Sequence, residues 1–268
     1  MSYGGAHAPR AAQNSIFLTS HADYARRVPT DLAIIVPVMN EEGNILPLAR
    51  EVAAALAQVP QSWELVLVDD GSTDATWPRI EEAQRADARV RGLRLERNSG
   101  QSAALWIGLH ATSSPVLATL DGDLQNDPAD LPRLLAELAQ CDFVIGVRVN
   151  RRDTFVRRAS SSVARWARRT VLGVNLHDTG CSLRVFRREV LHGLFGFNAV
   201  HRFLPILVQG GGARCREVPV NHRPRVAGVS KYGVWNRAWR GLVDLFAIAW
   251  FQKRRLRAVK FTECPPRG

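Results

Sequence analysis

The chain has 268 residues, of which 46% are hydrophobic and 23% charged, so a wholly disordered protein is excluded and one large or two small domains are expected. Its net charge of +11 favours anionic partners such as phosphorylated molecules, acidic lipid or nucleic acid. We predict no transmembrane helix, because none of the apolar stretches approaches the roughly 20 residues that a bilayer requires. The N-terminus has no apolar signal core, so we expect a cytoplasmic protein. The 4 cysteines form no CxxC pair, which indicates reduced thiols.

Short apolar strands alternate with helical patterns along most of the chain. Residues 1–30 are polar or small without a regular period, which predicts a flexible N-terminal tail. The strands predicted next are 32–38, 63–70, 91–95, 115–123 and 143–147. The helices predicted between them are 45–59, 73–86, 99–111 and 129–139. This alternation predicts an α/β fold with a mixed, mainly parallel central sheet and helices on both faces.

The pattern becomes more basic after residue 148. We predict a basic helix over 157–169, a strand over 183–186, a helical stretch from 201 and a strand over 217–221. A loop and an amphipathic helix over 234–251 follow. The expected organisation is therefore one domain over 31–233 and a C-terminal amphipathic and basic segment over 234–268.

Acidic side chains follow two of the predicted strands, at the sheet edge where ligands of such folds bind. Side chains alternate along an extended segment, so Asp121, Asp123 and Gln125 would share a face and hold Mg²⁺ or Mn²⁺. The alternative is a solvated turn, because Asp and Gly are ordinary turn residues. At the other strand end, Asp69 or Asp70 would accept hydrogen bonds from a base or ribose, and capping of the next helix is compatible with this.

Several common functions lack their motifs in this sequence. The first strand runs into an acidic loop, PVMNEE, and not into the glycine-rich turn of dinucleotide-binding proteins, and there is no Walker A sequence. Hydride transfer and P-loop chemistry are therefore excluded, and a nucleotidyltransferase is disfavoured because it would normally carry a glycine-rich loop here. A nucleic-acid-binding protein is disfavoured because no recognition motif or interleaved basic and aromatic pattern is present.

Five segments together resemble the family 2 glycosyltransferases of the GT-A fold, namely IIVPVMNEEGNI, VDDGSTDAT, RNSGQSAAL, DGDLQNDPADLP and AGVSKYG. Their order and spacing are most similar to the polyprenyl-phosphate subgroup, which includes enzymes like dolichol-phosphate mannose synthase. The resemblance implies an inverting, metal-dependent transfer of a sugar from a UDP- or GDP-sugar to dolichyl or undecaprenyl phosphate. A family 2 transferase acting on a polysaccharide or a protein is the alternative.

The resemblance also implies a role for individual residues. The nucleotide would be contacted by Pro37, Met39 and Glu41 with Asp69 or Asp70. The donor diphosphate would be bound through the metal on Asp121, Asp123 and Gln125 and by Arg225, Ser230 and Lys231. The acceptor phosphate would be bound by Arg148, Arg157, Arg158 and Ser161, which with Asp123 form the expected catalytic set. Several phosphate charges in one pocket require such arginines and a lysine.

The implied acceptor makes a general base unnecessary. A lipid phosphate, with a second pKa near 6, is mostly dianionic at pH 7 and can attack the anomeric carbon itself. We therefore assign no base, and Asp178 in the segment DTGCSLR is the one weak candidate.

The predicted helix over 234–251 carries a stripe of large apolar side chains at helical spacing, formed by Trp235, Trp239, Leu242, Val243, Phe246 and Trp250. The basic run QKRRLR follows it. This pattern favours an interfacial helix on anionic lipid and hence peripheral attachment to the inner face of the cell membrane. The alternative is that the stripe packs on the domain core or on a second subunit.

Overall fold

The computed structural model describes residues 30–148, 169–174, 176–224 and 234–254. In the last of these ranges the side chains are described only from Val243 onward. The predicted N-terminal tail lies almost wholly outside these ranges, as does most of the predicted basic helix. The same holds for several predicted phosphate ligands, namely Arg157, Arg158, Ser161, Arg225, Ser230 and Lys231.

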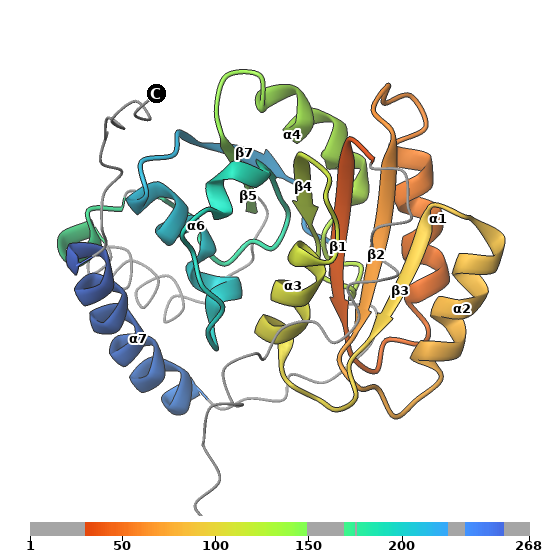
Figure 1. Ribbon diagram of the computed structural model, residues 1–268, viewed down its shortest axis with the longest axis horizontal. Coiled ribbons are helices and arrows are strands. Elements are labelled where there is room, and N and C mark those ends of the chain that lie inside the picture. The colour runs from red at the N-terminus through yellow and green to blue at the C-terminus, as the bar shows by residue number, and fades with distance from the viewer. Residues whose placement is uncertain (1–29, 149–168, 175, 225–233, 255–268) are drawn as a thin grey trace, which may run out of the picture.

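A seven-stranded sheet forms the centre of the molecule, in the order β3-β2-β1-β4-β6-β5-β7 (Figure 1). The strands are β1 Leu32–Val38, β2 Trp63–Asp69, β3 Val90–Arg94, β4 Val116–Thr119, β5 Phe143–Arg148, β6 Arg184–Arg187 and β7 Cys215–Val220. Only β6 runs antiparallel to its neighbours, β4 and β5, and the other pairs are parallel. The predicted mixed, mainly parallel sheet is confirmed.

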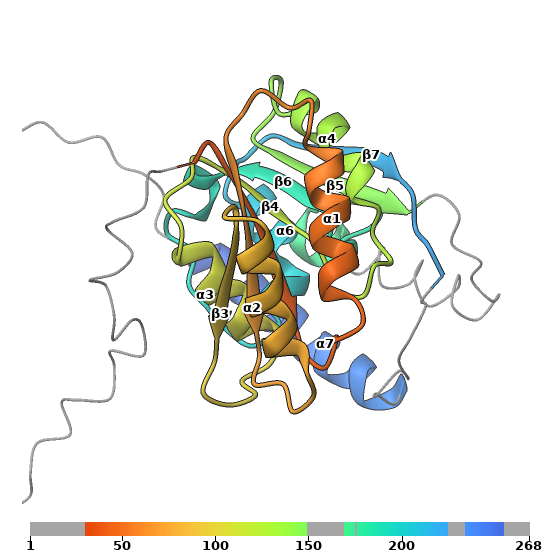
Figure 2. The same cartoon turned by 90° about the vertical axis from the view of Figure 1, so that its right-hand side faces the viewer.

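Helices cover both faces of the sheet, and Figure 2 shows α1 and α3 on opposite sides of it. The helices are α1 Ile45–Ala55, α2 Thr76–Ala86, α3 Gln101–His110, α4 Leu131–Glu137, α6 Val200–Gly210 and α7 Val234–Arg254. Two 3₁₀ turns, η2 Pro128–Asp130 and η3 Arg188–Leu191, complete the described elements. On one face α3 packs on β1 and β2, α6 packs on α3, and α7 packs on the outside of α6.

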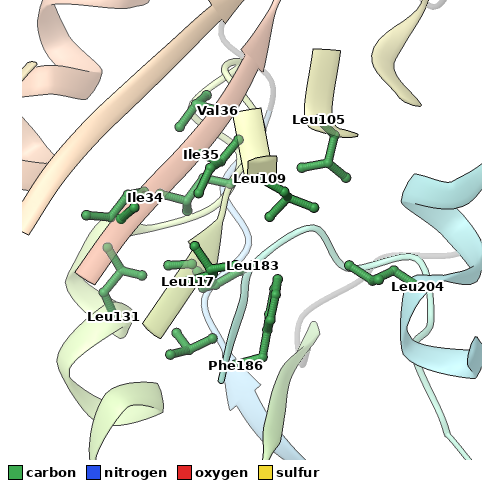
Figure 3. Close-up of a cluster of buried hydrophobic side chains, with 14 of the residues drawn as sticks. Ile34, Ile35, Val36, Leu105, Leu109, Leu117, Leu131, Leu183, Phe186 and Leu204 are labelled. Atoms are coloured by element: carbon green, nitrogen blue, oxygen red, sulfur yellow. The ribbon is translucent and has the colours of Figure 1, made fainter. Parts of the chain in front are cut away.

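The core forms around β1, the strand with the most continuous apolar run. Residues 32–36 have no exposed surface, as expected for a parallel strand covered on both faces. Successive β1 side chains point to opposite sides, Ile34 toward Leu131 and Ile35 toward Leu109 (Figure 3). The run LAIIVPV therefore joins the two helical layers into one hydrophobic core.

One predicted strand is shorter than expected, and the difference matters for the site. The predicted strand 115–123 ends at Thr119, because the chain turns at the Asp-Gly sequence and Leu124 adopts a left-handed conformation with φ of 58°. The expectation that Asp121, Asp123 and Gln125 alternate along an extended segment is therefore wrong, and these residues lie in a turn. Helix α1 likewise ends at Ala55 and not at the predicted residue 59. Helix α2 begins at Thr76, where Asp74 accepts from the backbone N–H and the hydroxyl of that residue.

Within the part of the chain that the structure describes, no helix is both long enough and apolar enough to cross a bilayer.

The fit of α3 against the sheet depends on Gly108. A Cβ at this position would lie 2.5 Å from Cγ2 of Ile35 and 2.9 Å from Cγ2 of Val68, both stiff β-branched side chains. We expect Gly108→Val to lower the free energy of unfolding by about 1–3 kcal/mol through overpacking. Urea unfolding followed by circular dichroism measures this, with Gly43→Val as the control, since a Cβ on Gly43 meets no atom within 4 Å. Equal unfolding midpoints for the two variants would contradict the close approach of α3.

Candidate active site

Two loops at the carboxyl ends of β1 and β2 are joined by hydrogen bonds between backbone and side chains. The backbone N–H of Asn40 donates to Ser72 Oγ at 2.9 Å, and that of Thr73 donates to Asn40 Oδ1 at 2.9 Å. Further along, Glu41 N–H donates to Thr76 Oγ1 at 2.8 Å. The side chains of Ser72, Asn40 and Thr76 thus satisfy backbone N–H groups of the two loops.

The predicted nucleotide contacts lie at this junction. Pro37 is the next-to-last residue of β1, and the sulfur of Met39 accepts from Asn98 Nδ2 at 2.9 Å. The carboxylate of Glu41 accepts from Asn44 Nδ2 at 2.6 Å, close to the start of α1. These three predicted residues follow closely on one another at the end of β1, and their contact with a nucleotide stays a prediction.

Asp69 and Asp70 are both buried and both make contacts within the protein. Asp70 accepts from the backbone N–H of Ser99 at 2.7 Å and of Gly100 at 2.9 Å, just before α3. Asp69 accepts from Ser72 N–H at 2.9 Å and forms an ion pair with Arg94 at 3.2 Å. Burial raises the pKa of Asp70, although the backbone hydrogen bonds oppose this rise. The structure thus shows helix and turn stabilisation by these carboxylates, and a contact with base or ribose stays a prediction.

The anchored start of α3 places Gln101 on the predicted metal ligand Asp121. Gln101 Nε2 donates to Asp121 Oδ1 at 2.9 Å, and Ser182 Oγ donates to Asp121 Oδ2 at 2.6 Å. Burial raises the pKa of Asp121, the negative charge of Asp123 adds to this rise, and the Ser182 hydrogen bond opposes it. Two carboxylates therefore lie together at this turn, at an energetic cost.

The turn after β4 suits a hard divalent cation by the chemistry of its donors. Asp121 and Asp123 offer carboxylate oxygens whose mutual repulsion a cation would relieve. Gln125 donates through Nε2 to the carbonyl of Arg223 at 3.4 Å. A cation would therefore bind the amide oxygen of Gln125 and not its nitrogen. No group of three or more His, Cys, Asp or Glu side chains with metal-binding geometry occurs among the described residues. Mg²⁺ typically takes one or two carboxylates and completes its shell with water and substrate phosphate.

Arg148, the predicted acceptor ligand, lies at the carboxyl end of β5. Its Nε donates to Asp178 Oδ2 at 2.7 Å and its Nη2 donates to Asp178 Oδ1 at 2.8 Å. Burial alone would raise the pKa of Asp178, but the hydrogen bonds and the charge of Arg148 outweigh it and lower this pKa. A carboxylate held in this way is a poor proton acceptor, so the single candidate for a general base is disfavoured.

Three residues that organise the site were not predicted from the sequence, namely Ser182, Glu217 and Arg223. Ser182 binds Asp121, Glu217 binds the loop that carries Asp178, and Arg223 pairs with Asp127 at 2.8 Å beside the predicted metal turn. The available signal was that these polar residues stand at or beside the ends of the predicted strands 183–186 and 217–221.

Two histidines and one cysteine have structural roles. His201 Nδ1 lies 2.6 Å from Ser102 Oγ, which joins α6 to α3, and burial lowers the pKa of His201 to about 4. His177 contacts Glu217. Cys181 is buried, and burial raises the pKa of its thiol to about 11. These side chains are therefore not assigned to binding or chemistry.

Comparison with known proteins identifies related chains. The family model described as glycosyl transferase family 2 matches residues 33–195. The dodecaprenyl-phosphate galacturonate synthase of Rhizobium johnstonii is 40% identical over 237 residues, which is 86% of this chain and 70% of that protein. The undecaprenyl-phosphate 4-deoxy-4-formamido-L-arabinose transferase of Pseudomonas fluorescens is 39% identical over 203 residues, 75% of this chain and 60% of that protein. The chain thus spans between 60% and 70% of these two relatives.

Solved structures show the same fold at lower sequence identity. Glucosyl-3-phosphoglycerate synthase from Mycobacterium tuberculosis, crystallised with Mn²⁺, UDP and phosphoglyceric acid, aligns with a TM-score of 0.61 and 19% identity. The match covers 84% of this chain and 78% of that one. The family match over more than half of the chain, together with the relative at 40% identity, shows that this protein belongs to glycosyl transferase family 2.

Proposed function

We propose that this protein is a metal-dependent, inverting glycosyltransferase that moves a sugar from a nucleotide diphosphate sugar to polyprenyl phosphate. The observation that carries the proposal is the proximity of a carboxylate pair and a fixed arginine. Asp121 and Asp123 follow β4, Arg148 ends β5, and one short segment contacts both, since Ser182 donates to Asp121 at 2.6 Å and Asp178 accepts from Arg148 at 2.7 Å. Adjacent sites for a metal-bound diphosphate and for an acceptor phosphate would have this arrangement.

In this proposal the residues divide between the donor and the acceptor. A Mg²⁺ or Mn²⁺ ion held by Asp121, Asp123 and Gln125 would stabilise charge on the departing diphosphate. Arg148 binds the acceptor phosphate, whose oxygen bonds to the anomeric carbon as the bond from that carbon to the diphosphate oxygen breaks. Because the acceptor is mostly dianionic at pH 7, with a second pKa near 6, no side chain has to remove a proton.

The remaining predicted phosphate ligands belong to the proposal but lie outside the described residues. They are Arg157, Arg158 and Ser161 for the acceptor, and Arg225, Ser230 and Lys231 for the donor.

The relatives support this acceptor and this class of donor. The two relatives at 39% and 40% identity are named for sugar transfer involving undecaprenyl and dodecaprenyl phosphate. The mycobacterial enzyme of the same fold was crystallised with UDP and Mn²⁺ or Mg²⁺, which makes UDP-sugars the first donors to test and GDP-sugars the second. A polysaccharide or protein acceptor has no comparable support.

The reaction is tested by transfer of labelled sugar from UDP- and GDP-sugars to undecaprenyl phosphate, with Mg²⁺ or Mn²⁺. We expect a labelled product that partitions into organic solvent and disappears with EDTA. Asp123→Ala should lower its rate by about 100-fold or more, since a metal supplies several kcal/mol of charge stabilisation.

Asp87→Ala is the matched control for this assay, because Asp87 lies in a turn remote from the site and pairs with Arg89. We expect its transfer rate to equal that of the wild type. Metal-dependent release of the nucleotide without a lipid product would contradict the phosphate acceptor while leaving a glycosyltransferase. A lipid product that forms equally well in EDTA would contradict the metal.

The protein is further proposed to bind peripherally to the inner face of the cell membrane through α7. One face of this helix packs on the domain, because Leu245 and Ile248 are buried and Gln252 Nε2 donates to the carbonyl of Ile206 at 3.2 Å. The opposite face carries Val243, Phe246 and Trp250, whose exposed fractions are 51%, 59% and 64%.

This exposed face continues into positive charge, as an interfacial helix on anionic lipid requires. Lys253 and Arg254, the last residues of α7, are both exposed, and the sequence continues with Arg255 and Arg257. The described members of the apolar stripe, Val243, Phe246 and Trp250, are therefore exposed, and α7 packs on the domain through its other face. The side chains of Trp235, Trp239 and Leu242 lie outside the described residues.

Membrane binding is tested by co-sedimentation with vesicles of phosphatidylglycerol and phosphatidylcholine at low salt. We expect Phe246→Glu to weaken binding by about tenfold or more, because a buried aromatic side chain contributes about 1.5–3 kcal/mol. Ala54→Glu is the control, since it adds the same charge at an exposed position of α1. If the two variants bind equally, α7 is not the membrane contact. This outcome would leave the proposed sugar transfer unaffected.

A further inference from the structure

A single loop, residues 176–183, contacts both halves of the candidate site. Near its start, Asp178 binds Nε and Nη2 of Arg148 at 2.7 and 2.8 Å. Four residues later, Ser182 donates to Asp121 at 2.6 Å. The predicted acceptor arginine and the predicted metal carboxylate are therefore positioned by the same short segment.

The loop is held in place by β7, the strand that pairs with β5. Glu217 Oε1 accepts from the backbone N–H of His177 at 2.7 Å and of Asp178 at 3.2 Å, while Oε2 lies 2.6 Å from His177 Nδ1. Glu217 pairs in register with Ile145 on β5, the strand that ends at Arg148. Glu217 thus fixes the backbone of Asp178 relative to the strand that carries its partner.

A buried arginine holds the same loop from inside the protein. Arg184 is 2% exposed, and it donates from Nε to the carbonyl of Cys181 at 2.8 Å and from Nη2 to that of Thr179 at 3.3 Å. The N–H of Gly180 donates to Asp178 Oδ1 at 3.2 Å. The carboxylate of Asp178 is consequently held by its own loop as well as by Arg148.

The contacts of Arg148 determine which edge of its guanidinium can bind a ligand. Nε and Nη2 are occupied by Asp178, and a Cβ on Gly180 would lie 3.2 Å from Nη2, so the loop backbone covers this side. Nη1 has no acceptor among the residues that the structure describes. A planar guanidinium held along one edge presents its remaining N–H groups in one direction.

We propose that Asp178 is a positioning residue, which orients Arg148 so that Nη1 meets the acceptor phosphate, and that it is not a general base. This inference rests on the proposed function. Both Asp178 oxygens already accept hydrogen bonds from Arg148, and a dianionic phosphate has no proton to transfer. Glu217 supports the same orientation one contact further away.

The test is the kinetics of Asp178→Asn with undecaprenyl phosphate as the varied substrate. Removing a charged hydrogen bond should raise the KM for the acceptor by about tenfold or more, with a much smaller change in kcat. The pH profile of kcat should keep the acidic limb of the wild type. Glu217→Gln, which leaves Asp178 itself intact, should change KM in the same direction by a smaller factor.

Asp142→Asn is the matched control, because Asp142 binds Nε and Nη2 of Arg214 at 3.1 and 2.8 Å in an exposed pair of the same geometry. Its KM and kcat should equal those of the wild type. A general base at Asp178 would give the opposite pattern, with kcat lowered by about 10²–10⁴ and the acidic limb lost. That pattern, or an unchanged acceptor KM in both Asp178→Asn and Glu217→Gln, would overturn the proposal.

Binding without turnover separates this inference from the proposed function. Farnesyl phosphate, titrated by ³¹P NMR, should bind to the wild type and to Asp142→Asn, and about tenfold or more weakly to Asp178→Asn. Equal binding by all three overturns the positioning role even if sugar transfer to undecaprenyl phosphate is observed. Failure of the wild type itself to bind overturns the phosphate acceptor and the positioning role together, and the two failures are therefore distinguishable.

Discussion

The candidate site depends on the burial of the Asp70 carboxylate against the start of α3. Burial of a carboxylate is unfavourable unless hydrogen bonds compensate it, and here the N–H groups of Ser99 and Gly100 do so. This contact ties the end of β2 to the first turn of α3, where Gln101 reaches Asp121. The end of β2 and the start of α3 therefore together place the Gln101 side chain on the predicted metal turn after β4.

The antiparallel strand β6 explains why the two halves of the site meet. In the register of β4 with β6, Thr119 at the end of β4 lies opposite Arg184 at the start of β6. The segment that precedes β6 consequently lies beside the segment that follows β4, and Ser182 reaches Asp121. A parallel strand at the same place would have sent this loop to the other edge of the sheet, away from the carboxyl ends.

Local patterns were sufficient to predict most of the fold and only part of the site. The apolar run of β1 and the alternation of strands with helices predicted the sheet, because burial on both faces leaves a periodic signal. The turn after Thr119 was missed because Leu120, which is also buried, continues the apolar pattern of the strand. Ser182 and Glu217 were missed because their partners are 61 and 39 residues away, and no local pattern reports such contacts.

The packing of α7 on α6 has a consequence for how a lipid substrate would approach. α6 joins α3 through His201 and Ser102, next to the residue that contacts Asp121, and α7 lies on the far side of α6. The distance from the open face of α7 to the site is therefore set by helix packing and not by a flexible linker. With α7 at the bilayer surface, the phosphate of the carrier would have to rise to a fixed height above the lipid headgroups, while its isoprenoid chain stays in the bilayer.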